Sequence, residues 1–595
     1  MRKIFTLLAL MACTLTFAAT TVQIGDLYYS LGTTTAQVIK DQTTNNSVYS
    51  TYTSVTIPAS VTYEDYTYPV TSIGTSAFEA LTNLQSVTLP STITTIYTDA
   101  FYGCTKLGSI NLPEGLTTIN QRAFYNCNLT SITVPSTVTT IGSGAFKGNP
   151  TTSVTWLPKT CSVGSDSNAP FYNEYSKITS FILGDSVQEI PSYLCKHMSK
   201  LDTVVLPPSV RLLGQNAFQY CTSLKSINLP VTQKTLPVSF LEGCTALESI
   251  TLPATLTTIS TDVFYGCTNL ANVNLHEGLT TIGQRAFYNC KLTDVTVPST
   301  VTSIGSAAFK SNPTTSVTWL PKTCSIGTDS NAPFYNEYSK ITSFTFGDSV
   351  EVIPAYLCKY MNKLDTIIIP QTVTSIGQSA FMYCTNLKAF EFPKGIKTVA
   401  TSVLEGCTAL QSVVIPSSVT TINQDAFYNC SGLQAIYNYA FTPQTITARA
   451  VYNVNKSTCI LYVPMDYIDL YQEATVWKDF LNIVGVATDL QFEDQIVNVT
   501  YLKADSTLHY MEVQNWEVPH APRIEGFTFL KWQVLAGDLA EGIVLQAVYT
   551  ANEPTDVESP SLQGRSGEAS KLIKEGNVYI LRDDELFTIS GQKVK

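Results

Sequence analysis

The sequence is poor in charge and has no long apolar run beyond its first residues. Only 14% of its 595 residues are Asp, Glu, Lys or Arg, well below the usual quarter. The net charge is −11 without a cluster of Lys and Arg, which argues against a nucleic-acid partner because phosphate backbones require clustered positive charge. After residue 19 no apolar stretch approaches the length of about 18 residues that a transmembrane helix needs, so none is predicted.

What the sequence has is a short unit that recurs along most of its length. Residues 85–107 read QSVTLPSTITTIYTDAFYGCTKL, and residues 411–433 read QSVVIPSSVTTINQDAFYNCSGL. Phe78, Phe101 and Phe124 follow one another at equal intervals, each one repeat unit apart. A fixed period of this length indicates a solenoid of stacked coils, in which each coil packs only against its neighbours.

Each coil is predicted to open with a very short strand. In SVTLP, alternation places Val87 and Leu89 on the inner face and Ser86 and Thr88 on the outer face. Pro90 ends the strand because proline cannot donate to the ladder. Coils stacked about 4.8 Å apart would form a continuous parallel sheet. Its outward positions are short, polar and mostly uncharged: Thr88, Asn111, Thr133, Asn228, Thr251, Asn274, Thr296 and Glu391.

A block of about seven coils is present twice, as residues 84–246 and 247–409. The stretches LEGCTAL, WLPKTC and APFYNEYSK each occur twice with the same offset, LEGCTAL for example at 241–247 and at 404–410. In both copies one coil is longer than the others, at 153–178 and at 316–341, and contains Gly, Asp, Ser and Asn. We predict that each of these irregular coils carries a protruding loop.

The predicted fold class is mainly β, with the solenoid flanked by smaller segments. Residues 1–19 have the basic start, the apolar run and the small residues of a secretory signal peptide. The stretch LMAC at residues 10–13 could instead be a lipoprotein cleavage site, and this alternative stays open. In chain order we predict a signal peptide at 1–19, an N-terminal cap at 20–53, the solenoid at 54–483 with a helix at 466–483 as its end cap, a small β-rich domain at 484–551, a flexible linker at 552–570 and a short β segment at 571–595.

The repeated coil resembles the BspA-type leucine-rich repeat, also called the Treponema pallidum type. That pattern has a short strand ending in Ile/Leu-Pro, then Val-Thr-x-Ile-Gly, then Ala-Phe-x-x-Cys, and residues 141–146 (IGSGAF) and 376–381 (IGQSAF) match it. The resemblance implies a leucine-rich repeat solenoid on the outer surface of a bacterium. It also implies adhesion to host matrix proteins or to other cells.

Two further resemblances concern the C-terminal part of the chain. GFTFLKW at 526–532 is similar to the Listeria–Bacteroides repeat domain, a small β-grasp-like module. NVYILR at 577–582 and GQKV at 591–594 resemble the C-terminal sorting signal of the Bacteroidota type IX secretion system. The second resemblance implies surface attachment through the C-terminal segment.

The fifteen cysteines are interpreted as structural. Nine occupy one repeat slot, three residues after the Phe position: Cys104, Cys127, Cys221, Cys244, Cys267, Cys290, Cys384, Cys407 and Cys430. A ladder of small buried thiols is expected there, since in-register stacking does not supply disulfide geometry and a line of thiols does not converge on a metal. Disulfides between Cys161 and Cys195, and between Cys324 and Cys358, are left open.

We expect no catalytic site, cofactor or metal site. The second copy has Tyr360 in place of His197, and the first copy has Pro113 in place of His276, so neither position requires an imidazole. The sequence contains no Gly-rich phosphate loop, no paired inward carboxylates and no calcium-loop pattern.

The irregular coils supply the candidate ligand contacts. When the irregular coil is aligned with the others from its Leu-Pro pair, Trp156 and Trp319 point outward. When it is aligned from the first apolar residue of the strand, Val154 in the first copy, they point into the core. The coil therefore has one extra residue, so a β-bulge is predicted, and core packing of the two tryptophans remains the alternative. An outward Trp beside an aromatic loop would form a contact hot spot. The candidates are Trp156, Phe171, Tyr172 and Tyr175 in the first copy, and Trp319, Phe334, Tyr335 and Tyr338 in the second.

The sequence therefore favours a secreted, monomeric, non-catalytic binding protein on the outer surface of a bacterium. Its expected partner is an extracellular protein or matrix ligand. The alternative is a surface glycan-binding protein used in nutrient acquisition, and an enzyme is the least favoured class.

Overall fold

In the computed structural model the chain forms two compact units, Met1–Val486 and Ala487–Lys595. In the first unit the structure describes residues 19–42, 49–164, 166–171, 176–327, 329–335 and 339–486. In the second unit it describes the backbone of the strands alone. The predicted signal peptide and linker therefore lie largely outside the described residues, and of the sorting-like tail only the backbone of its strands is described.

The first unit begins with a small mixed sheet. Strands β1 (Thr20–Ile24), β2 (Leu27–Leu31) and β3 (Ala36–Ile39) pair antiparallel in chain order. The edge of β3 then pairs in parallel with β6 (Tyr66–Ile73), which also forms a hairpin with β5 (Ser60–Tyr63). The first coil is thus joined to this sheet through β6.

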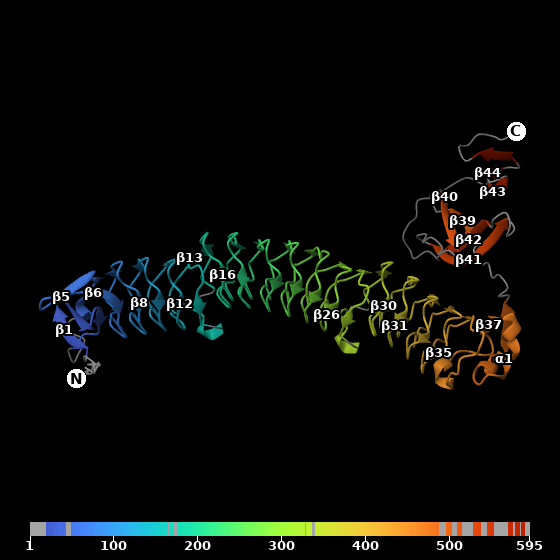
Figure 1. The fold of residues 1–595 in the computed structure, drawn as a ribbon, viewed down its shortest axis with the longest axis horizontal. Helices are drawn as coiled ribbons and strands as arrows, with labels where there is room; N and C mark the ends of the chain where they lie inside the picture. The colour runs from blue at the N-terminus through green and yellow to red at the C-terminus, as the bar shows by residue number, and fades with distance from the viewer. Residues whose placement is uncertain are drawn as a thin grey trace, which may run out of the picture. The chain divides into compact units, whose positions relative to one another are not determined.

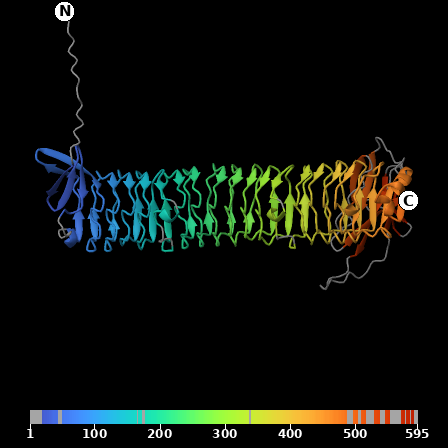
Figure 2. The same cartoon turned by 90° about the horizontal axis from the view of Figure 1, so that it is seen from below.

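The coils stack side by side into an elongated, gently curved solenoid (Figure 1), and Figure 2 shows their short strands in rows. The strands form two parallel ladders. The Ser-Val-Thr ladder opens each coil and consists of β4 (Ser54–Thr56), β7 (Ser86–Thr88), β9 (Ser109–Ile110), β11 (Ser131–Val134), β13 (Ser153–Trp156), β15 (Ser180–Leu183), β17 (Thr203–Val204), β19 (Ser226–Ile227), β21 (Ser249–Ile250), β23 (Asn272–Val273), β25 (Asp294–Val297), β27 (Ser316–Trp319), β29 (Ser343–Phe346), β32 (Ala389–Glu391), β34 (Ser412–Ile415), β36 (Ala435–Asn438), β37 (Ile460–Pro464) and β38 (Asn482–Val486).

The Thr-Ile ladder lies later in each coil and was not predicted as a second sheet. It consists of β8 (Thr95–Ile96), β10 (Thr118–Ile119), β12 (Thr140–Ile141), β14 (Ser162–Val163), β16 (Glu189–Ile190), β18 (Leu212–Leu213), β20 (Thr235–Leu236), β22 (Thr258–Ile259), β24 (Thr281–Ile282), β26 (Ser303–Ile304), β28 (Ser325–Ile326), β30 (Val352–Ile353), β31 (Ser375–Ile376), β33 (Thr398–Val399) and β35 (Thr421–Ile422).

The predicted continuous sheet is wrong in one respect, because both ladders are interrupted. In the Ser-Val-Thr ladder β11, β13 and β15 form one sheet, and β25, β27 and β29 form another. Each of these two sheets begins next to a strand of only two residues, β9 and β23, that pairs with the preceding strand instead. The stack is therefore held together mainly by its core and by turn hydrogen bonds between coils.

The core is a set of columns in which equivalent side chains lie on top of one another. Phe78, Phe101, Phe124, Phe146 and Phe171 are all fully buried. Their rings are stacked with centroids 5.2–5.5 Å apart. Because each ring contacts the equivalent ring above and below, the burial of one coil depends on its neighbours.

Most coils also contain two residues with left-handed backbone, at the second position before and the second position after the Phe slot. Asp99 (φ 57°) and Gly103 (φ 73°) flank Phe101 in this way. The position after the Phe is glycine or asparagine in many coils, for example Gly266 and Asn429. These residues adopt positive φ at low cost, whereas larger side chains are strained there.

The cysteine ladder has the expected position and an additional role. Each of the nine slot cysteines donates its S–H to the carbonyl oxygen of the Phe-slot residue in the preceding coil, with S···O distances of 3.0–3.3 Å. None of the described cysteines forms a disulfide, and the two pairs left open by the sequence do not form. Cys195 instead occupies a Phe slot, since its carbonyl accepts from Cys221.

The buried thiols predict a loss of stability at alkaline pH. Burial raises the pKa of Cys104, Cys384 and Cys430 from an ordinary 9.0 to about 12. Because the folded pKa lies above the unfolded one, folding stability is complete below about pH 9 and falls as the pH rises toward the folded pKa. We expect circular dichroism to show cooperative unfolding between these limits. Rapid labelling of these thiols by a soluble disulfide reagent in the folded protein near neutral pH would contradict this prediction.

The C-terminal end of the solenoid differs from the single helix predicted at 466–483. That stretch contains the 3-10 helices η5 (Met465–Tyr467) and η6 (Trp477–Asp479), the short helix α1 (Ile468–Glu473) and the start of β38. Trp477 is fully buried and donates its indole N–H to the carbonyl of Gln444 at 2.8 Å. The remaining 3-10 helices are η1 (Tyr49–Thr51), η2 (Asp166–Asn168), η3 (Asp329–Asn331) and η4 (Ala448–Val451).

The second unit is built from antiparallel strands. Strand β39 (Ile496–Leu502) pairs with β40 (Leu508–Gln514), and β41 (Phe527–Ala536) pairs with β42 (Val544–Ala551). A three-stranded sheet contains β43 (Ala569–Lys574), β44 (Asn577–Arg582) and β45 (Glu585–Thr588). Over the described part of the chain, no helix has both the length and the apolar composition needed to cross a membrane.

Candidate recognition surface

The two tryptophans predicted as ligand contacts are core residues. Trp156 and Trp319 are each 0% exposed. Trp156 pairs in register with Val134 and Leu183, without a bulge. The strand ends at Trp156, so the extra residue, Leu157, lies in the following turn. The inward alignment is thus the one adopted, since it removes the largest apolar side chain of the coil from water.

The aromatic loops beside these tryptophans are only partly described. Phe171 and Phe334 are fully buried in the Phe column, so they too are core residues and not surface contacts. Tyr335 is partly exposed, and the ammonium of Lys310 lies 4.9 Å from the centre of its ring. The other three candidates, Tyr172, Tyr175 and Tyr338, lie outside the described residues.

The irregular coils project from the solenoid, as predicted. Figure 1 shows η2 and η3 on the same side of the stack, in the teal and yellow-green parts of the chain. Lys359 donates to a carboxylate oxygen of Asp329 in η3 and is itself mostly buried. This ion pair ties the second projecting segment to the following coil.

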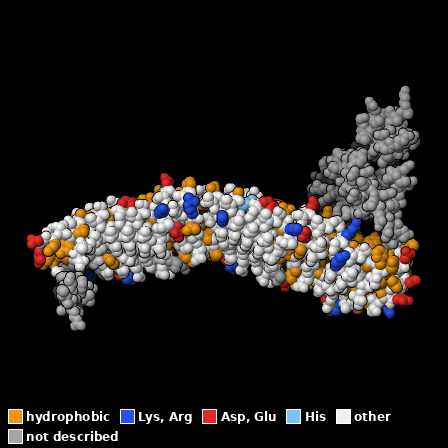
Figure 3. Space-filling view, viewed as in Figure 1, with side chains coloured by type: hydrophobic (Ala, Val, Ile, Leu, Met, Phe, Trp, Pro, Cys, Tyr) orange, Lys and Arg blue, Asp and Glu red, His pale blue; other side chains and the backbone are white. Residues whose placement is uncertain are grey.

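The outward positions of the Ser-Val-Thr ladder form an exposed polar face. All eight outward positions predicted from the sequence are exposed. Figure 3 shows one side of the solenoid, on which uncharged polar side chains and backbone predominate among scattered charged and apolar side chains. The outward positions of the ladder are likewise polar and mostly uncharged. This surface has the chemistry of hydrogen bonding and not of charge attraction.

The hydroxyl groups of the coils fall into two classes. Thr94, Thr117 and Thr280 each donate to the carbonyl of the equivalent residue one coil earlier, at 3.0–3.2 Å, so their hydroxyls are used within the fold. In contrast, the outward hydroxyls of Ser131, Thr133, Ser153 and Thr155 make no hydrogen bond to any described residue. The second class is available to a ligand.

Ser131, Thr133, Ser153 and Thr155 lie on two neighbouring strands of four residues each, β11 and β13. The sheet of β11, β13 and β15 has four residues in each strand and lies in the first copy; the sheet of β25, β27 and β29 is its equivalent in the second. Both sheets include the strand of an irregular coil. The structure thus presents two equivalent three-stranded patches on one face, which we call the strand face.

A second candidate surface was not predicted from the sequence. It consists of two equivalent groups of aromatic and charged side chains, mostly half-buried, in the three coils that follow each irregular coil. The first aromatic cluster contains Tyr193, Lys196, His197, Tyr220 and Glu242, and the second contains Tyr356, Lys359, Tyr360, Tyr383 and Glu405.

In the first aromatic cluster two rings are stacked at the surface. The rings of His197 and Tyr220 have centroids 4.9 Å apart and an interplanar angle of 15°. Tyr220 is 37% exposed and donates its hydroxyl to a carboxylate oxygen of Glu242 at 2.8 Å. This hydrogen bond raises the pKa of Tyr220 to about 12, so the phenol remains a donor at physiological pH. The ammonium of Lys196 lies 5.4 Å from the ring centre of Tyr193.

The second aromatic cluster repeats this arrangement. Tyr360 is 39% exposed, and its ring is 5.1 Å from that of Tyr383, with 9° between their planes. Tyr383 donates to Glu405 at 3.3 Å. The ammonium of Lys359 lies 5.0 Å from the ring centre of Tyr360 and 5.4 Å from that of Tyr356. The two clusters thus share their geometry although His197 is replaced by a tyrosine.

Three other tyrosines, which are half-buried, lie beside ion pairs between Asp and Arg. The guanidinium of Arg122 forms two hydrogen bonds with Asp99, at 2.6 and 2.8 Å, and lies 5.6 Å from the ring centre of Tyr102. The same arrangement recurs at Asp262, Arg285 and Tyr265, and at Asp425, Arg449 and Tyr428. Because donors and acceptors satisfy one another here, these groups are best explained as ties between coils.

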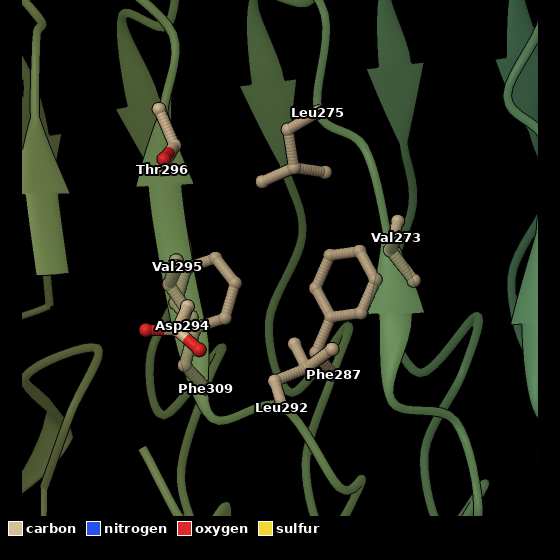
Figure 4. A pocket seen from close by; sticks show the side chains of 8 residues that line it. All are labelled: Val273, Leu275, Phe287, Leu292, Asp294, Val295, Thr296 and Phe309. Atoms are coloured by element: carbon tan, nitrogen blue, oxygen red, sulfur yellow. The ribbon is translucent and has the colours of Figure 1, made fainter. Parts of the chain in front are cut away.

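The described surface offers little to a small ligand. Figure 4 shows a cavity between β23 and β25, where the Ser-Val-Thr ladder is interrupted. It is lined by Val273, Leu275, Phe287, Leu292, Asp294, Val295, Thr296 and Phe309, and its volume is about 10 Å³. This is the space of a single water molecule. No three His, Cys, Asp or Glu side chains among the described residues converge as metal ligands.

A parallel two-ladder solenoid with a repeated Phe-x-x-Cys column is the architecture of a leucine-rich repeat protein. The chain belongs to the BspA-type leucine-rich repeat family: the profile of this region, with six repeat copies, matches residues 71–201, 188–316, 234–365 and 325–458. Together these matches cover more than half of the chain, which confirms the family predicted from the coil. None of the curated proteins compared with this chain matched it.

Several solved structures are similar to this chain. A leucine-rich repeat protein from Bacteroides ovatus is 25% identical, with 70% of this chain and 94% of that chain covered and a TM-score of 0.41. A leucine-rich cell surface protein from Faecalibacterium prausnitzii is 25% identical, with coverages of 73% and 93% and a TM-score of 0.21. The pneumococcal vaccine antigen PcpA is 17% identical, with coverages of 79% and 99% and a TM-score of 0.25.

Proposed function

We propose that this protein is a non-catalytic recognition scaffold, exported to the outer surface of a bacterium, that binds an extracellular protein or matrix ligand through the strand face. The observation that carries this proposal is the row of outward hydroxyls with no partner within the fold, such as Thr133 and Thr155. Family membership supports the same class of function.

The chemistry of the strand face fits a large and polar partner. An extended flat sheet gives many donors and acceptors but no deep pocket, and recognition of this kind depends on contact area and on hydrogen bonds. The predicted signal peptide and sorting-like tail support display outside the cell. Attachment through residues 571–595 and a monomeric state form part of the proposal.

The proposal is tested by binding of the full-length protein to an array that carries extracellular matrix proteins together with neutral and acidic polysaccharides. We expect retention by at least one matrix protein. The double variant Thr133→Arg/Thr155→Arg should reduce this binding at least tenfold, because two bulky charged side chains would stand on one patch.

The control is Ser162→Arg, which places one arginine on the Thr-Ile ladder of the irregular coil that contains Thr155. Ser162 is exposed, so its replacement should leave both stability and binding unchanged. Equal loss of binding in the control and in the double variant would contradict recognition by the strand face. So would the absence of binding to every protein on the array.

A further inference from the structure

We infer that the two aromatic clusters are two equivalent binding sites for an uncharged polysaccharide, and that one polysaccharide chain occupies both. This activity goes beyond protein recognition by the strand face and uses different residues. The stacked rings of both clusters are attached to the second left-handed position of their coils, two residues after the Phe slot.

At this position four coils carry a bulky ring where others carry glycine or asparagine. His197, Tyr220, Tyr360 and Tyr383 have φ values of 65°, 59°, 67° and 60°. A bulky side chain with this backbone is strained relative to a glycine. Strain of this kind persists where the surrounding structure holds it, and it is concentrated at ligand-binding and catalytic positions.

The neighbouring coil is shaped to accept these rings. A Cβ atom on Gly243 would collide with the ring of Tyr220, and one on Gly406 would collide with the ring of Tyr383. The glycine in each following coil therefore provides the surface on which the tyrosine lies. This arrangement of a strained ring seated on a glycine is present in both copies of the block.

The two copies keep the aromatic clusters although the sequence around them has changed. Arg211 corresponds to Thr374, and Leu212 corresponds to Ser375 in the second copy. The rings, the lysine beside them and the glutamate that accepts the tyrosine hydroxyl are present in both. Folding alone does not require these rings, because the same slot accepts asparagine elsewhere in the solenoid, for example at Asn126.

The chemistry of each cluster matches an uncharged, hydroxyl-rich ligand. Ring edges supply apolar contact, while the oxygens of the phenols and carboxylates supply acceptors to sugar hydroxyls. The first cluster contains one lysine and one glutamate, Lys196 and Glu242. In the second cluster Lys359 is ion-paired with Asp329, and Glu405 adds a further negative charge. Neither cluster therefore carries the excess positive charge that would attract an acidic polymer. A protein interface would need about 800 Å² on each side, far more than one pair of rings can cover.

The spacing of the clusters favours a repeating ligand. Tyr220 and Tyr383 occupy equivalent places in the two copies of the block, seven coils apart, which corresponds to about 34 Å along the stack at the spacing of parallel strands. A polysaccharide presents the same unit at many points along one chain and can occupy two equal sites on a solenoid. Occupation of the second site is then intramolecular, and affinity rises without new contacts.

The test uses the full-length protein with three soluble neutral polysaccharides, mixed-linkage β-glucan, xylan and galactomannan, and with polygalacturonate as the acidic comparison. The variants are Tyr220→Asn, Tyr383→Asn and the double variant. Asparagine suits the left-handed backbone, so these variants should fold at least as stably as the parent. Tyr66→Asn is the control, because Tyr66 is 67% exposed and lies in the N-terminal hairpin.

We expect binding to at least one neutral polysaccharide, a roughly 100-fold weaker apparent affinity in each single variant through loss of bivalency, and no binding in the double variant. A short oligosaccharide of the same sugar should bind at two sites per chain in the parent and at one in each single variant. Absence of binding to every neutral polysaccharide, binding to polygalacturonate alone, or unchanged binding in the double variant would overturn the inference.

Failure of this inference is separable from failure of the proposed function. The variant Thr133→Arg/Thr155→Arg should retain full polysaccharide binding, and the Tyr220→Asn/Tyr383→Asn variant should retain binding to a matrix protein. Loss of matrix-protein binding in the tyrosine variant would show that the clusters belong to the protein-binding surface, and this result would also overturn the inference.

Discussion

Replacement of Asn149 with alanine is expected to destabilise the solenoid by about 3 kcal/mol or more, because it leaves three buried backbone groups without partners. Asn149 is fully buried and occupies the cysteine slot of its coil. Its side-chain oxygen accepts from the backbone N–H of Leu129 at 2.9 Å, and its amide donates to the carbonyls of Phe124 and Phe146, both at 2.8 Å. Alanine can replace none of these bonds.

The matched variant is Asn149→Cys, which restores the residue found at this slot in neighbouring coils. Cys127 satisfies one carbonyl through its thiol, so a cysteine at 149 should recover part of the loss and leave the N–H of Leu129 unpaired. The denaturation midpoint, followed by far-ultraviolet circular dichroism, should therefore rank the parent above the cysteine variant and the cysteine variant above the alanine variant. An alanine variant as stable as the parent would contradict this account.

Replacement of Phe287 with alanine is expected to cost about 3–5 kcal/mol, the range for truncating a large buried aromatic side chain. Phe287 is fully buried between two equivalent rings, 5.1 Å from Phe264 and 5.4 Å from Phe309. Its loss opens a cavity in the column and uncouples two coils, since each coil depends on its neighbours for burial.

The control for this prediction is Phe441→Ala. Phe441 is 46% exposed, and surface substitutions of this kind usually change stability by no more than about 0.5 kcal/mol. The denaturation midpoint of the Phe287 variant should fall well below that of the Phe441 variant. Equal midpoints would show that the Phe column contributes less than its burial indicates.

The coil was predictable because its pattern is local and is repeated many times. Val87, Phe101 and Cys104 occupy fixed places in one short repeated unit, and a stack offers one interior on which all of them can converge. The structural role of the slot cysteines was also predictable, because residues at the same position of many stacked coils have the same surroundings. The donation of the thiols to the preceding carbonyls was not predictable, because it depends on the vertical offset between coils.

The prediction of Trp156 and Trp319 as ligand contacts was wrong because their orientation is not decided locally. Trp156 could be aligned inward or outward because the extra residue of its coil could lie before or after it. The strand pairing decided this question by placing Trp156 beside Val134 and Leu183. The aromatic clusters were missed for a related reason. The sequence does contain rings at the slot of Asn126, but their significance appears only once the left-handed backbone at that slot is known.

The sequence by itself determined the solenoid, its family, its seven-coil duplication and the residues of its core, since a fixed repeat period constrains every coil in the same way. Tertiary structure alone decided which hydroxyls remain unpaired, which way Trp156 and Trp319 point, and which rings stand at the surface. Those properties depend on contacts between successive coils. A repeat pattern specifies what each coil contains, and the stacking of coils decides which of those groups remain available for binding.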